Sequence, residues 1–105
     1  SGARVMNTLL GEAVRNLLAG IDPRREIRIL EVGGGVGSAT LAVLPHLAHA
    51  RVRYTFTDVS SWFTTQAREK LAAYPFVDFG LLDLTADPQQ LGYRPRTYDL
   101  ILAAN

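Results

Sequence analysis

The stretch "ILEVGGGVGSAT", residues 29–40, restricts the fold more than any other part of the chain. The run that enters it, "EIRILEV" (26–32), is short, rich in β-branched residues and bounded by proline and glycine, which is typical of a strand. The run that leaves it, "SATLAVLPHLAHA" (38–50), has helical character, and Pro45 should bend or end its regular part. The stretch therefore predicts a strand, a glycine-rich loop and a helix.

The rest of the chain also alternates helices with strands. We expect helices over 3–19 and 60–74, strands over 51–58, 76–84 and 97–105, and a turn or short helical loop over 87–92. The first helix should end at Gly20 and lie on the sheet. This alternation predicts one α/β domain, a parallel sheet with helices on both faces, because right-handed crossovers place them there.

Composition excludes several classes of function. The 105 residues suffice for one small core, and no apolar run approaches the roughly 20 residues of a membrane span. A net charge of +1 offers no strong field for nucleic acid or an anionic membrane, so neither is an expected partner. There is no cysteine, hence no disulfide, cysteine-bound zinc or cysteine nucleophile, and the first residues do not form a signal peptide. A cytoplasmic location fits best.

Parallel sheets bind ligands at the carboxyl ends of their strands, and acids stand there in this chain. Glu31, Asp58, Asp83 and Asn105 lie at or near the four predicted ends. A dinucleotide loop would need glycine at position 38, which is serine, and Glu31 would repel a pyrophosphate; NAD remains an alternative. A phosphate-binding P-loop would need a lysine that the loop lacks. S-adenosylmethionine, with a cationic end, a ribose diol and an adenine amine, suits these acids.

The loop "LEVGGGVGS" resembles the E/D-x-G-x-G-x-G loop of class I S-adenosylmethionine-dependent methyltransferases, matched by Glu31, Gly33, Gly35 and Gly37. The segments "YTFTDVSSWF", "FVDFGLLDL" and "YDLILAAN" are similar to successive segments of C-methyltransferase domains in polyketide synthases and mixed peptide-polyketide megasynthases. The resemblance runs from about residue 25 to the end of the chain. It implies a Rossmann-like, partial methyltransferase fold with strand order 3-2-1-4.

The resemblance also assigns a binding role to each residue of the cofactor site. The bare backbone of the three loop glycines would approach the methionine part of the cofactor, and Glu31 would hold its ammonium side, directly or through water. The carboxylate of Asp58 would accept both ribose hydroxyls. Val59 would pack on the adenine, and Asp83 would accept a hydrogen bond from the adenine amine. Leu84 would line the adenine pocket, and Asn105 would lie near the transferred methyl.

Several of these residues also have purely structural interpretations. Acids and serines after strands often cap the next helix, which is an alternative for Asp58, Asp83 and Asn105 and the role assigned to Ser60 and Ser61. Aromatic residues at the start of an amphipathic helix commonly belong to the core. We expect Phe63, more than Trp62, to be a core residue. The spacing of His46 and His49 would suit two metal ligands or two general bases. Both lie towards the end of their helix that is remote from the glycine-rich loop, so no metal site is expected.

By the same resemblance the chain is the cofactor-binding half of a larger domain. The family sheet has seven strands in the order 3-2-1-4-5-7-6, and its catalytic histidine and acid follow strand four, after Asn105. The expected partners are the rest of the methyltransferase domain and an acyl chain on a carrier protein, methylated at the α-carbon of a β-ketoacyl intermediate. An N-methyltransferase domain of a peptide synthetase and a non-catalytic, structural methyltransferase-like domain are the alternatives.

Overall fold

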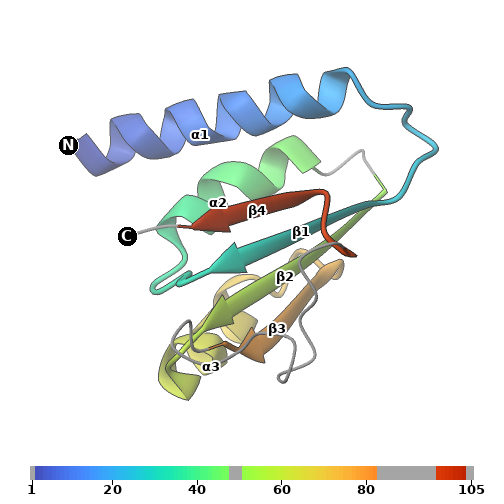
Figure 1. Cartoon of the computed structure of the whole chain (residues 1–105). Helices are drawn as coiled ribbons and strands as arrows, with labels where there is room; N and C mark the ends of the chain where they lie inside the picture. Colours follow the sequence, from blue (N-terminus) through green and yellow to red (C-terminus); the bar gives the residue numbers. More distant parts are fainter. Residues whose placement is uncertain (1, 48–50, 83–96, 104–105) are drawn as a thin grey trace.

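The computed structural model describes residues 2–47, 51–82 and 97–103 (Figure 1). In these residues three α-helices and one 3-10 turn lie on one side of a four-stranded sheet. The elements in chain order are α1 (Gly2–Ala19), β1 (Ile27–Val32), α2 (Ser38–Val43), the 3-10 turn η1 (Leu44–Leu47), β2 (Val52–Asp58), α3 (Ser61–Lys70), β3 (Val77–Leu81) and β4 (Leu100–Ala103). The predicted α/β alternation is thus confirmed.

The sheet is parallel throughout and has the strand order β3-β2-β1-β4, as predicted. β1 pairs with β2 from Ile27 opposite Val52 to Glu31 opposite Phe56, and with β4 from Ile29 opposite Leu100. The strand order therefore reverses at β1, since β2 lies on one side of it and β4 on the other. Ligand sites of open parallel sheets form at this reversal, and here the glycine-rich loop leaves β1 at that point.

The main core lies between the sheet and the helices α2 and α3. Alternate strand residues such as Ile29, Tyr54 and Phe56 are fully buried there, because one face of a strand collects every second side chain. Val43 of α2 and Ala67 of α3 pack against them. The opposite face carries a smaller cluster of Leu30, Val32 and Leu82. The sequence predicts helices on both faces, but the segment between β3 and β4 lies mainly outside the described residues.

Helix α1 packs on α2 and η1 rather than chiefly on a strand (Figure 1), which differs from the expectation that it lies on the sheet. Gly11 permits this close approach, since a Cβ at that position would lie 2.6 Å from the carbonyl oxygen of Ala42. Val14 is the α1 side chain that enters the main core. None of the helices in the described part of the chain combines the length and the apolar character needed to cross a membrane.

The sequence predicts the end of α2 but not the end of α3. α2 ends at Val43 and tightens into η1, which contains Pro45, as the sequence predicts. α3 spans Ser61–Lys70 and is shorter than the predicted 60–74. The residues after Lys70 form turns instead, in which the Tyr74 N–H donates to Leu71 O at 2.9 Å, and Tyr74, directly before Pro75, disfavours helical geometry.

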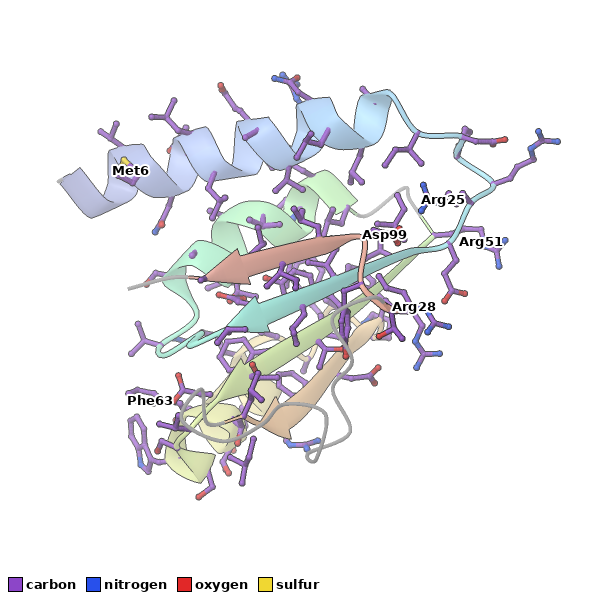
Figure 2. The ribbon with its side chains drawn as sticks, in the orientation of Figure 1. Met6, Arg25, Arg28, Arg51, Phe63 and Asp99 are labelled. Atoms are coloured by element: carbon purple, nitrogen blue, oxygen red, sulfur yellow. The ribbon has the colours of Figure 1, made fainter. Side chains whose placement is uncertain are left out.

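Charged side chains fix β4 to the amino end of β1. The Arg25 guanidinium donates to Asp99, the Arg28 backbone N–H donates to Asp99 Oδ2 at 2.9 Å, and the Asp99 N–H donates to Arg28 O at 2.8 Å. Figure 2 shows Arg25, Arg28, Arg51 and Asp99 gathered at this end, opposite the end where Met6 and Phe63 lie. The glycine-rich loop lies at the opposite, carboxyl end of β1.

The outer edge of β4 generates the first prediction. Among the described residues β4 pairs with β1 alone, and Ile101 is 49% exposed on this edge strand. We expect the isolated chain to self-associate in static light scattering, because unpaired strand amides and apolar side chains promote strand pairing. Ile101→Lys should reduce this association, while Leu17→Lys on the exposed side of α1 should leave it unchanged. A monomeric wild-type chain at high concentration would contradict the prediction.

Candidate functional site

The loop between β1 and α2 owes its shape to alternate glycines. Gly33, Gly35 and Gly37 have φ values of 68°, 55° and 83°, a left-handed region that side chains with a Cβ avoid. Around Gly35 a Cβ would meet nothing within 4 Å, so this backbone borders open space. The three glycines of the predicted motif are therefore required by the backbone conformation, and Gly35 is also open to a ligand.

Gly34 stands between the motif positions and has no predicted role. A Cβ at Gly34 would lie 2.2 Å from Cε2 of Phe56, so only glycine fits beneath this ring. Its N–H donates to Thr57 O at 2.9 Å, which fixes the loop to the end of β2. Lys70 of α3 adds a contact by donating from Nζ to Val36 O at 2.5 Å. The loop is thus held from β2 and α3.

Asp58, at the end of β2, uses both carboxylate oxygens within the protein. Oδ2 accepts the Gly35 N–H at 2.9 Å and Oδ1 accepts the Ser60 N–H at 3.1 Å. Asp58 therefore joins the glycine-rich loop to the start of α3, and each oxygen keeps a further lone pair for a ligand. Ser60 does occupy the N-cap position, but its side chain makes no capping hydrogen bond, so the predicted capping role of its hydroxyl is not observed.

Glu31, near the end of β1, is only 1% exposed. Two hydroxyl groups donate to the same carboxylate oxygen, Oε1: Thr40 Oγ1 of α2 at 2.5 Å and Tyr54 Oη of β2 at 2.5 Å. Burial raises the pKa of Glu31, while these two hydrogen bonds act in the opposite direction. Burial and the adjacent Glu31 also raise the pKa of Tyr54 far above its usual value, so Tyr54 stays a hydrogen-bond donor.

A cavity of about 530 Å³ opens beside Glu31. It lies between α1, the start of α2 and β4, and its described lining residues are Met6, Asn7, Leu10, Glu31, Ala39, Val43, Tyr54, Ile101, Leu102 and Ala103. Most of these side chains are apolar, and the carboxylate of Glu31 is the charged group among them. The arrangement suits the end of a ligand that carries a positive charge.

The other predicted residues lie apart from this cavity or outside the described residues. Val59 is 66% exposed directly after Asp58, which leaves its side chain open to contact. Trp62 is 62% exposed and packs edge-on against Phe63, with ring centroids 5.3 Å apart. Phe63 is the more buried of the two, but it is only half-buried and belongs to neither core cluster, so the expectation that it is a core residue is wrong. His46 is exposed on η1. Asp83, Leu84, Asn105 and His49 lie outside the described residues.

These features define the class of the protein. A parallel sheet whose order reverses at a glycine-rich loop, with buried acids at the ends of its first two strands, is a Rossmann-like α/β domain. A family model described as "Methyltransferase domain" matches residues 30–105, and the chain belongs to this family. The resemblance found in the sequence is thereby confirmed.

Individual relatives agree with this assignment. The highly reducing polyketide synthase ALT1 of Alternaria alternata is 40% identical over 100 residues, which cover 90% of this chain and 4% of that protein. The CurJ carbon methyltransferase superposes with a TM-score of 0.95 at 39% identity, over 100% of this chain and 28% of that one. The trans-methyltransferase CalH, solved in complex with SAH, gives a TM-score of 0.70 at 30% identity, over 97% and 27%. The chain thus matches only a small part of each.

Replacement of Gly34 tests its packing beneath Phe56. We expect Gly34→Ala to lower the free energy of unfolding by about 1–3 kcal/mol, because the new methyl overlaps the ring. The matched control is Gly35→Ala, which meets no neighbouring atom and should cost about 1–2 kcal/mol through its left-handed backbone alone. Combining each change with Phe56→Leu in chemical denaturation separates the two causes. Relief by Phe56→Leu should occur with Gly34→Ala and be absent with Gly35→Ala.

The buried carboxylate of Glu31 gives a pH prediction. Burial raises its folded-state pKa above the usual carboxyl value, so the folded chain holds this proton more tightly than the unfolded chain. The contribution of Glu31 to stability is therefore fully present below about pH 4.3 and is lost as the pH rises through the raised pKa. In denaturation series, the stability of Glu31→Gln relative to wild type should increase over this window. A flat or falling difference would contradict the assignment; Glu12→Gln measures the effect of removing an exposed carboxylate.

Proposed function

We propose that this chain is the S-adenosylmethionine-binding half of a methyltransferase domain in a polyketide synthase. The supporting observation is one geometric fact: the loop of left-handed glycines lies between two buried acids, Glu31 and Asp58, at the reversal of strand order. The membership of the chain in the methyltransferase family and its likeness to a carbon methyltransferase support the same proposal.

The chemistry of the described residues fits this cofactor. Its ammonium would meet Glu31 in a cavity whose other described lining side chains carry no charge. Its ribose hydroxyls would donate to Asp58, whose two oxygens each retain a lone pair. Its adenine would lie towards the exposed Val59, with Asp83 and Leu84 as further contacts and Asn105 near the methyl. When bound, the cofactor supplies an electrophilic methyl group for in-line transfer.

The site disfavours a dinucleotide. Glu31 lies two residues before Gly33, the first glycine of the loop, where its negative charge would oppose a pyrophosphate, and position 38 carries serine instead of the third glycine. The pyrophosphate would also approach Asp58, whose carboxylate already bonds the Gly35 amide that a phosphate would need. Two acids around one loop favour a ligand with positive charge and hydroxyl donors.

The relatives are far longer than this chain, which bears on activity. The chain spans 28% of the CurJ carbon methyltransferase, and the outer edge of β4 has no partner among the described residues. We infer that further polypeptide completes the domain, adds the groups that deprotonate the acceptor, and receives a β-ketoacyl chain from a carrier protein for methylation at its α-carbon. This chain would hold the methyl donor and place it for attack.

Titration by nuclear magnetic resonance tests the proposed cofactor. Addition of S-adenosylhomocysteine to the labelled chain should shift the amide signals of residues 33–37 and 58–60, whereas NAD should leave them in place. Asp58→Asn should weaken this binding by about tenfold or more, because a hydrogen bond to a charged group is lost. Asp78→Asn, on the exposed surface of β3, is the matched control.

Two results would contradict the proposal. The first is the absence of any shift with S-adenosylhomocysteine, or equal shifts with NAD, which would remove the cofactor assignment. The second is methyl transfer to a β-ketoacyl thioester by the pure 105-residue chain, which would remove the assignment of the deprotonating groups to further polypeptide.

A further inference from the structure

The hydrogen bonds around Glu31 are distributed unequally between its two oxygens. Thr40 and Tyr54 both donate to Oε1, and Oε2 receives no hydrogen bond from the residues that the structure describes. The carboxylate also lines the cavity between α1 and β4. One oxygen is therefore held by the protein, while the other is left for a ligand in the cavity.

The partners of Glu31 are neutral, which distinguishes it from a structural ion pair. All four salt bridges of the described residues lie at exposed or half-exposed sites and none involves Glu31. Hydroxyl groups can orient a carboxylate and favour its ionised form, but they leave its net charge uncompensated. A buried, uncompensated charge is unfavourable unless a counter-charge is supplied. Glu31 lines the cavity, so a cation bound there would lie near this carboxylate.

We propose that Thr40 and Tyr54 are positioning residues that hold Glu31 for the ammonium group of the cofactor. This proposal rests on the function proposed above and adds two residues to it. Thr40 fixes Glu31 from α2 and Tyr54 fixes it from β2, so the carboxylate is held between two elements. The apolar walls around it, including Met6 and Leu10 of α1, strengthen the attraction for a cation.

Two ligands that differ only at this end separate a positioning role from a structural one. S-adenosylhomocysteine carries the amino acid end, and methylthioadenosine has the same nucleoside without it. We expect Tyr54→Phe and Thr40→Val to weaken binding of S-adenosylhomocysteine about tenfold or more, the loss typical of a hydrogen bond to a charged group. Their binding of methylthioadenosine should stay within about twofold of wild type. Thr40→Ser keeps the hydroxyl and should bind both ligands as wild type does.

The outcomes are distinguishable in the same titrations, run on the full chain. Equal losses for both ligands would show a structural role and overturn the inference, as would unchanged binding of S-adenosylhomocysteine. If Tyr54→Phe does not fold, the pair Thr40→Val and Thr40→Ser decides, because the two differ in the hydroxyl at one position. A wild-type chain that binds neither ligand would overturn the proposed function and this inference with it. If the wild-type chain binds S-adenosylhomocysteine but the variants change the affinity for both ligands equally, the inference alone is overturned.

Discussion

The hydrogen bond from the Gly34 amide to Thr57 O is the contact on which the geometry of the site depends. It holds the loop that leaves β1 against the end of β2, while Phe56 covers Gly34 so closely that no side chain fits. With the loop held there, the Gly35 amide reaches Asp58, and the acids at the ends of neighbouring strands border one loop. The chain turns within this short loop, and the three glycines adopt the left-handed backbone conformations that the turn requires.

Much of this architecture could be predicted from local patterns. The alternation of apolar residues predicts β2 with Val52, Tyr54 and Phe56 on its buried face, and Pro45 predicts the end of α2; the structure has both. The acids Glu31 and Asp58 could be placed at the carboxyl ends of strands because parallel strands end at the same edge of a sheet. These predictions succeeded because each depends on residues close together in the sequence.

The remaining features depend on contacts between distant residues. Nothing in the local sequence pairs Tyr54 with Glu31, 23 positions earlier, or shows that Gly34 lies beneath Phe56 rather than facing a ligand. The alternating pattern marks Tyr54 as core, and its ring is indeed buried, but its hydroxyl has a polar function that hydrophobicity conceals. Similarly, the expectation that the first helix lies on the sheet could not anticipate that α2, brought close by Gly11, is its main neighbour.

The burial of Glu31 also links stability to ligand binding. Without a cation the ionised carboxylate costs stability, because only two neutral hydroxyls replace the water it has lost. A ligand that brings positive charge into the cavity removes this cost, so part of its binding energy appears as stabilisation of the fold. A neutral glutamine would relieve the same cost permanently, yet would lose the attraction for a cation. Retaining an acid here therefore makes sense as a feature of recognition, at a position where stability alone favours an uncharged residue.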